Sequence, residues 1–140
     1  MVTCGGPPRL QRRAVALRES KLMSWKLLGT DLILRLDGYV HASLGVPGQD
    51  QGTGWSQELT LVVHGAHILE EPRELPLWIS GGAATIAGEP LALLPVPFDE
   101  QLPLVLRLEG AAETLAASGS GLTLAAIGEP RFVERVAAQR

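Results

Sequence analysis

Apolar and polar residues alternate along two long stretches in the first half of the chain. In DLILRLDGYVHAS (31–43), leucines and Val40 share one face, whereas Arg35 and His41 lie on the other. WSQELTLVVH (55–64) repeats the pattern, with Trp55 and three aliphatic residues on one face. A period of two is typical of antiparallel strands with one buried face. The glycine-rich GVPGQDQGTG between them predicts an exposed loop or a wide hairpin end.

Shorter apolar segments follow, separated by turn residues. They are LPLWI, AATIA, LALLPVPF, LPLVLRLEG, ETLAA, LTLAAI and RFVERV. We therefore predict an all-β fold, an antiparallel β-sandwich or jelly-roll-like barrel of about eight or nine short strands. Any helix should be short and lie within residues 9–20 or in the C-terminal RFVERVAAQR, which fits a strand or a helix equally. Pro95 and Pro97 place LALLPVPF at a sheet edge, because proline cannot donate to the ladder.

Two segments resemble each other, SGGAATIAGEP (80–90) and SGSGLTLAAIGEP (118–130). Each reads as a Ser-Gly turn, a short strand with a central threonine, and a Gly-Glu-Pro turn. The similarity reflects either a duplicated half-barrel with a ligand on its pseudo-axis, or chance in a chain rich in alanine and glycine.

The first 22 residues differ from the rest in charge. The formal charges of residues 1–22 sum to +4, whereas those of residues 23–140 sum to −7. We interpret residues 1–22 as a disordered extension, or as residues that precede a translation start at Met23, and residues 23–140 as a single β domain. The alternatives are an organelle transit peptide and a basic arm for an anionic partner. The acidic body would repel nucleic acid, so no nucleic-acid partner is expected.

Composition also bears on the compartment. Cys4 is the only cysteine, so no internal disulfide can form, which fits a reducing compartment. No stretch approaches the roughly 18 apolar residues that a membrane span requires. We expect a cytoplasmic protein that does not associate with membranes.

The segment HGAHILEE (64–71) concentrates histidines and carboxylates. His64-x-x-His67-x-x-Glu70 contains ligand types for a divalent transition metal, and strand pairing could bring His41 alongside. In a regular strand, however, residues three apart point to opposite faces, so one site needs a bulge at Gly65. The other interpretation is that all three histidines are surface residues at strand ends.

This segment is similar to the first metal-binding motif of the cupin family, a His-x-His pair followed by a glutamate. The intervals here differ, since the pattern is His-x-x-His-x-x-Glu. GEPLALLPVPFDE (88–100) resembles the second cupin motif in its Gly-Glu and its later proline, but the downstream histidine is missing. The resemblance implies a cupin-like sandwich, and in the alternative hypothesis a metal-dependent enzyme or metal-binding protein using His41, His64, His67 and Glu70.

Other catalytic signatures are absent. The sequence has no Gly-x-Ser-x-Gly elbow and no phosphate-binding Gly-x-x-x-x-Gly-Lys loop. The carboxylates Glu70, Glu71 and Glu74 flank Pro72, a pattern more typical of a solvated turn than of an acid–base pair. We lean toward a protein that is not an enzyme, and we favour no cofactor.

Binding is the favoured function. Trp55 begins a strand beside the glycine-rich loop, where an aromatic residue could line a ligand mouth or cap the core. Together with Tyr39 and Gln57 it forms the candidate ligand site, for a small molecule or a protein. LALLPVPF offers an apolar edge for a second copy. We predict a small non-enzymatic binding or assembly module that is homo-oligomeric.

Overall fold

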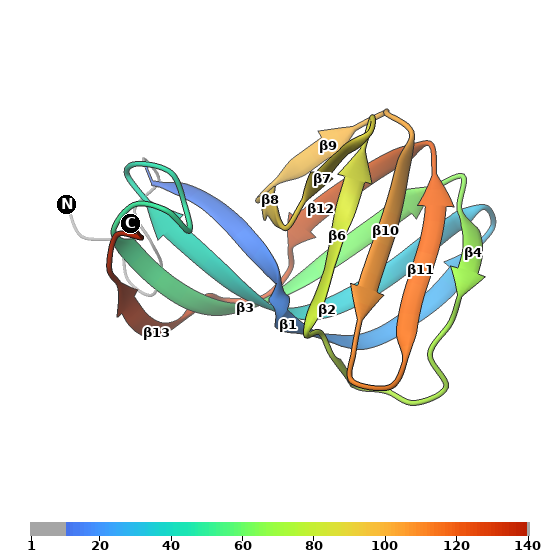
Figure 1. The fold of residues 1–140 in the computed structure, drawn as a ribbon, viewed down its shortest axis with the longest axis horizontal. Coiled ribbons are helices and arrows are strands. Elements are labelled where there is room, and N and C mark those ends of the chain that lie inside the picture. The colour runs from blue at the N-terminus through green and yellow to red at the C-terminus, as the bar shows by residue number, and fades with distance from the viewer. Residues whose placement is uncertain (1–10, 140) are drawn as a thin grey trace.

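The computed structural model describes residues 11–139, which form two antiparallel β-sheets packed face to face without closing into a barrel (Figure 1). The predicted β-sandwich is confirmed. The described residues contain no helix, so the short terminal helices that we allowed are strands instead. They form thirteen strands rather than eight or nine, because several short segments of two to four residues pair as separate strands.

The larger sheet is built on a meander of three long strands. Its strands are β1 (Arg12–Leu28), β2 (Asp31–Ser43), β3 (Gly52–His64), β5 (Leu77–Trp78), β8 (Leu93–Pro95), β9 (Phe98–Glu100), β12 (Gly121–Ala126) and β13 (Arg131–Val136). They pair in the order β5-β1-β2-β3-β12-β9, with β8 also on β1 and β13 also on β3. The segment 93–100 therefore supplies a strand to each edge of the larger sheet. The edge position that the prolines predicted is confirmed.

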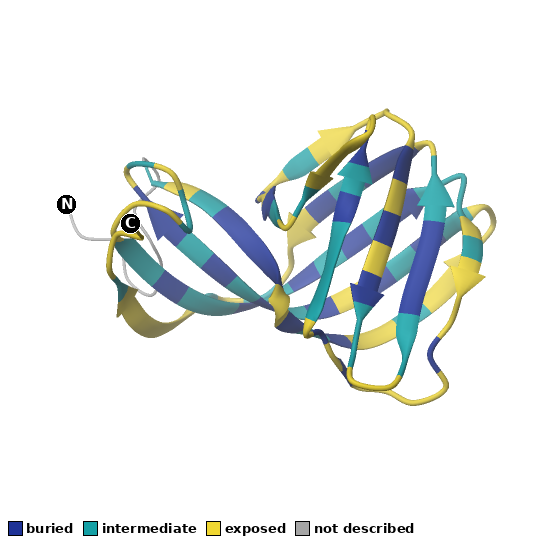
Figure 2. Ribbon diagram, in the orientation of Figure 1, coloured by how far each residue is buried: buried dark blue, intermediate teal, exposed yellow. Residues whose placement is uncertain are grey.

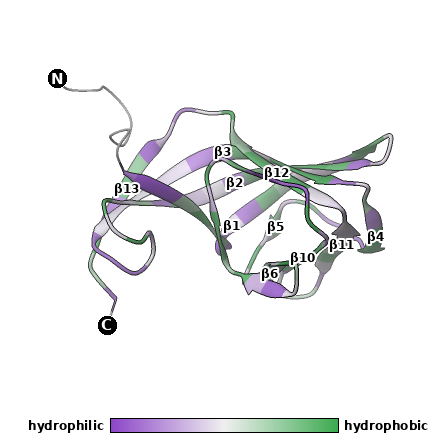
Figure 3. Ribbon diagram, turned by 90° about the horizontal axis from the view of Figure 1, so that it is seen from above, coloured by the Kyte–Doolittle hydropathy of each residue, from purple (hydrophilic) through white to green (hydrophobic). Residues whose placement is uncertain are grey.

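The smaller sheet pairs in the order β4-β11-β10-β6-β7. These strands are β4 (His67–Glu70), β6 (Gly81–Ile86), β7 (Glu89–Leu91), β10 (Leu104–Glu109) and β11 (Thr114–Gly119). Hydrophobic and hydrophilic residues alternate along the strands of the molecule (Figure 3). The alternation directs one face of each sheet toward the other sheet.

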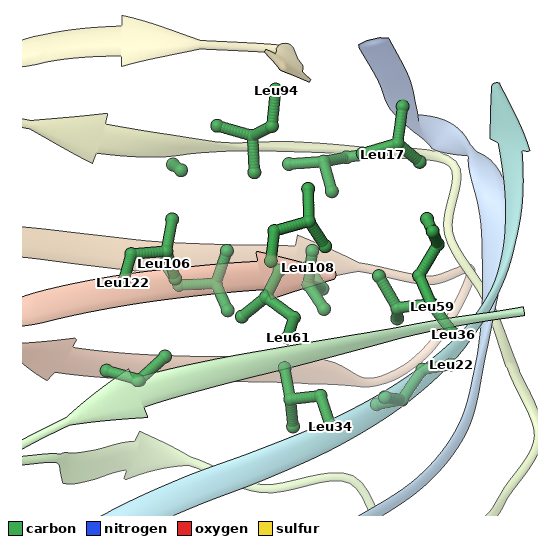
Figure 4. Close-up of a cluster of buried hydrophobic side chains, with 14 of the residues drawn as sticks. Leu17, Leu22, Leu34, Leu36, Leu59, Leu61, Leu94, Leu106, Leu108 and Leu122 are labelled. Atoms are coloured by element: carbon green, nitrogen blue, oxygen red, sulfur yellow. The ribbon is translucent and has the colours of Figure 1, made fainter. Parts of the chain in front are cut away.

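Leucines from both sheets meet in the core (Figure 4). The predicted inward faces of β2 and β3 are buried, and Trp55 packs partly buried against the same cluster. Leu106 and Leu108 of β10 cover them from the smaller sheet. Burial of one such side chain contributes about 1.5–3 kcal/mol, so the packing between the sheets dominates stability.

The larger sheet extends beyond the sandwich at one end (Figures 1 and 2). We call this end the terminal lobe. It comprises the paired ends of β1, β2 and β3, the loop 44–51 and β13. The smaller sheet does not cover it, and strand β13 pairs with β3 there.

The domain boundary that we expected at residue 22 falls inside β1. Leu17 and Leu22 are fully buried, and the strand pairs with β2 from Arg12 onward. A bulge between Ala16 and Lys21 interrupts the pairing, and the Ser20 hydroxyl donates to the Ala16 carbonyl across it (2.7 Å). Residues 1–10 lie outside the described residues. A translation start at Met23 remains a prediction, and it would remove the first half of this strand.

Glycines lie at two of the points where the chain passes from one sheet to the other. Gly65, with φ of 58°, separates β3 in the larger sheet from β4 in the smaller. Gly119 and Ser120 mark the return from β11 to β12, and the Ser120 amide donates to the His64 carbonyl (2.8 Å). The two similar segments contribute β6 to the smaller sheet and β12 to the larger one.

Candidate functional site

A cleft of about 880 Å³ opens at the end of the terminal lobe. The loop 44–51 forms one wall and β13 forms another. The residues that carry its chemistry are Gln11, Leu44, Phe132, Arg135 and Val136. Ligand sites are usually concave, largely apolar, and furnished with a few polar groups, and this cleft has that composition.

The loop wall is held by its own hydrogen bonds. The Asp50 carboxylate accepts from the Val46 amide (2.6 Å), and the Asp50 amide donates to the Val46 carbonyl (2.9 Å). The Ser43 hydroxyl donates to the Gln51 carbonyl (2.7 Å), which ties the loop to the end of β2. The carboxylate of Asp50 is thus used within the loop, so the wall is preorganised.

Trp55 supports the opposite wall. Its ring packs edge-on against Phe132 with 5.5 Å between centroids, and its indole N–H donates to the Thr53 hydroxyl (2.7 Å). Phe132 keeps 55% of its surface exposed and lines the cleft. The predicted ligand residue Trp55 therefore positions a cleft residue and is not itself part of the lining.

Two polar groups of the cleft have no polar partner among residues 11–139. The Oε1 atom of Gln11 is buried and accepts no hydrogen bond from the residues described. Arg135 forms no ion pair within residues 11–139. A buried acceptor without a donor is costly, and a guanidinium group recognises carboxylates, sulfonates and phosphates. The cleft thus combines an apolar wall, one cation and one acceptor.

Tyr39, also a predicted ligand residue, lies on the outer face of the larger sheet. Its hydroxyl donates to the Glu134 carboxylate, and its ring contacts the His41 ring edge-on at 4.9 Å. Burial, followed by the Glu134 carboxylate, raises the pKa of the Tyr39 hydroxyl. Tyr39 lines a hollow of only about 90 Å³, too small for most ligands, beside Trp78.

Gln57, the third candidate, is buried on the inward face of β3. Its amide nitrogen donates to the Gly128 carbonyl (2.8 Å), and its oxygen accepts from Arg13 (3.2 Å). These bonds satisfy a polar group among apolar neighbours and connect β3 to the segment before β13. The three candidates are therefore dispersed over an outer face, the core and the wall of the cleft.

The four residues of the metal hypothesis also lie apart. His41 pairs with Gly54 on β3, whereas His64 lies at the far end of that strand. His67 belongs to β4 of the smaller sheet, because the chain changes sheets at Gly65. Glu70 forms an ion pair with Arg107 (3.3 Å). Within residues 11–139, no three His, Cys, Asp or Glu side chains are arranged to hold a metal ion.

His64 belongs instead to a polar row across four neighbouring strands. Its Nδ1 lies 3.4 Å from Asp31 on β2, and its Nε2 lies 2.8 Å from the Thr123 hydroxyl on β12. The Thr123 hydroxyl donates to Asp99 on β9 (3.2 Å). The order Thr123, His64, Asp31 resembles a nucleophile–His–Asp catalytic triad. In a triad, however, the nucleophile donates its proton to the histidine, whereas Thr123 donates to Asp99. The row cross-links strands, as does the ion pair of Arg35 and Glu58.

Acidic side chains line a second hollow of about 550 Å³, beside the loop after β4. Glu71 and Glu74 lie there with Arg73, whose amide donates to the Glu113 carboxylate. Glu109 and Glu70 both contact Arg107 and raise the pKa of its guanidinium group. Glu71 and Glu74 are exposed to solvent, in agreement with the predicted solvated turn, and Glu70 is paired with Arg107.

Comparison with known protein families, characterised proteins and solved structures finds no match for this chain. No helix among residues 11–139 is long and apolar enough to cross a membrane. The function is therefore inferred from the residues of the cleft. The sequence contained a signal for its two walls, the glycine-rich loop and the apolar alternation in RFVERV, but no signal that they meet.

Proposed function

We propose that this protein is a non-enzymatic binding module whose ligand occupies the cleft between the loop 44–51 and β13. The observation that supports it is the cleft itself. It is the largest of the hollows described above, and it combines the exposed ring of Phe132 with Arg135 and the acceptor of Gln11. The groups around it form no nucleophile–base pair, which favours binding over catalysis.

The ligand that fits this chemistry is amphipathic and anionic. Its apolar part packs on Phe132 and Leu44, and its acidic group pairs with Arg135. A rotation of the Gln11 side chain, which lines the cleft, would let its oxygen accept from a hydroxyl or N–H group of the ligand. Asp50 keeps its negative charge while it accepts from the Val46 amide, so the acidic group of the ligand is expected on the Arg135 side of the cleft.

The test uses anilinonaphthalene sulfonate, a dye with an aromatic body and one anionic group. We expect saturable binding to the wild-type protein, with enhanced dye fluorescence. Arg135→Ala and Phe132→Ser should each weaken binding by about tenfold or more, because a charge-assisted hydrogen bond or a buried ring contributes more than about 1.4 kcal/mol.

Arg131→Ala is the matched control. Arg131 is an exposed arginine of the same strand that does not line the cleft. Its removal changes the net charge as Arg135→Ala does and should leave dye affinity unchanged. Equal affinity in all four proteins would show that the dye binds elsewhere and would refute the proposed site.

A further inference from the structure

The chain covers most of the edges of its larger sheet with its own segments. Strand β9 pairs with β12, and β13 pairs with the exposed side of β3 in the terminal lobe. On the outer side of β1, β8 covers residues 14–16 and β5 covers Lys21 and Leu22. Unpaired strand edges invite association with other strands, and folds normally blunt them in this way.

The second half of β1 is different. Within the part of the chain that the structure describes, no strand pairs with the outer side of residues 23–28, although β2 pairs with their inner side. Large apolar side chains are exposed along it, with 41% of Met23, 51% of Leu27 and 64% of Leu28 accessible. Trp78 of the adjoining β5 is 67% exposed and extends this apolar surface.

We propose that this edge pairs with the same edge of a second copy, antiparallel and about a two-fold axis, so that the larger sheets of both copies become continuous. An antiparallel strand is self-complementary about such an axis, as an isologous interface requires. Residues 23–28 also hold only one charged residue, Lys26.

That lysine restricts the position of the axis, because an axis at Lys26 would place the two ammonium groups opposite each other. An axis at Trp25 places Lys26 opposite Ser24 and Met23 opposite Leu27, so that like charges do not face each other and apolar side chains do. Lys21, the next cation along the strand, lies 4.3 Å from the centre of the Trp78 ring in its own copy. Its charge is thereby held beside the tryptophan of its own chain.

The cleft and this edge lie at opposite ends of β1, so the dimer stands independently of the proposed ligand site. The experiment is sedimentation velocity of the full chain from about 1 to 100 micromolar, a range that covers dissociation constants typical of modest interfaces. We expect a mass approaching twice that of one chain, which is 14.9 kDa.

Met23→Glu combined with Leu27→Glu should produce a monomer with an unchanged circular dichroism spectrum, because it places carboxylates opposite each other across the axis. Leu102→Glu combined with Val105→Glu, two exposed apolar residues outside the edge, is the matched control and should remain dimeric. A wild-type monomer throughout the range, or a dimer equally stable in both variants, would overturn the proposal.

Disulfide trapping provides a readout that does not depend on the charged variants. In a Cys4→Ser background, Ser24→Cys and Lys26→Cys proteins are mixed and oxidised. The axis at Trp25 predicts mainly the mixed disulfide dimer. Cross-linking no faster than for Val105→Cys would contradict the pairing.

Discussion

Gly82 and Gly88 of the smaller sheet show two different reasons why a side chain is unfavourable: an unusual backbone conformation and steric crowding. Gly82 and Gly88 both have positive φ, 116° and 86°. A Cβ at Gly82 would lie 2.0 Å from the Arg107 carbonyl oxygen, whereas one at Gly88 would meet nothing within 4 Å. Gly82 thus allows β6 and β10 to approach closely, and Gly88 serves only the turn between β6 and β7.

We expect Gly88→Ala to lower the free energy of unfolding by about 1 kcal/mol and Gly82→Ala by about 3 kcal/mol or more. Urea unfolding followed by tryptophan fluorescence measures both. Losses of equal size would mean that β6 can move away from β10 without cost.

Tyr39 is the only tyrosine, so its ionisation can be observed directly in the ultraviolet absorbance. Because its pKa is raised in the folded chain, the native phenol should ionise above the ordinary value of about 10. Above that pH only the unfolded chain loses this proton, so stability should fall as the pH rises from about 10 toward the native pKa.

Glu134→Gln removes the carboxylate that accepts from Tyr39, and should lower the native pKa while leaving it above the ordinary value, since burial is the larger cause. Glu129→Gln is a control that removes the same charge in the segment before β13. A native titration midpoint that Glu134→Gln leaves unchanged would show that the Tyr39–Glu134 bond does not form in solution.

The sequence predicted single residues well where burial alone determines them. The alternating leucines of β2 and β3 could be assigned to the inward face because their period matches the pleat. Gln57 and His64 could not be interpreted in this way. Their partners, Gly128 for the former and Thr123 for the latter, are more than 50 residues away, and only the pairing of strands reveals them.

At the scale of elements, β1 shows why a strand can be overlooked in sequence analysis. Residues 14–17 are all buried, so the first half of β1 lacks the alternation of a half-exposed strand. The bulge before Lys21 then shifts the period. Arg12, Arg13 and Arg18 also lie in this half of the strand, and their charge favoured the interpretation of a disordered extension. The predicted segment LPLWI contains β5, whereas LALLPVPF merged parts of β7, β8 and β9 into one strand, because strands of two to four residues are too short to display any period.

Truncation tests the role of this element. Removing residues 1–22 deletes Val15, Leu17 and Leu22 from the core and the partner of β8. Three buried aliphatic side chains contribute several kcal/mol, and typical domains have only about 5–15 kcal/mol of stability. We expect the truncated chain to lose its cooperative thermal transition.

Removing residues 1–10 alone deletes none of the described strand pairs and should preserve that transition. A protein starting at Met23 that melts as cooperatively as the full chain would show that β8 and β2 need no partner from residues 12–22.

At the scale of the whole molecule, the cleft could not be predicted because it depends on distant segments. The loop 44–51 and β13 are about eighty residues apart, and they meet only because β13 returns to pair with the start of β3. Neither the glycine-rich loop nor the RFVERV segment identifies its counterpart. The sandwich itself was predictable, since strand periods and turn spacing are local properties.

The segment 93–100, which gives β8 to one edge of the larger sheet and β9 to the other, also bears on the order in which the molecule folds. Strands β1, β2 and β3 are joined by short connections, whereas β8 and β9 need β1 and β12 already in place. Because contacts distant in sequence require costly loop closure, this segment should dock after the rate-limiting step of folding.

Stopped-flow kinetics of two core variants tests this order. Leu94→Ala should speed unfolding by about thirtyfold or more with little change in the refolding rate, whereas Leu34→Ala in β2 should slow refolding. The segment 93–100, which pairs with both edges of the larger sheet, would thus slow unfolding and set the lifetime of the native state.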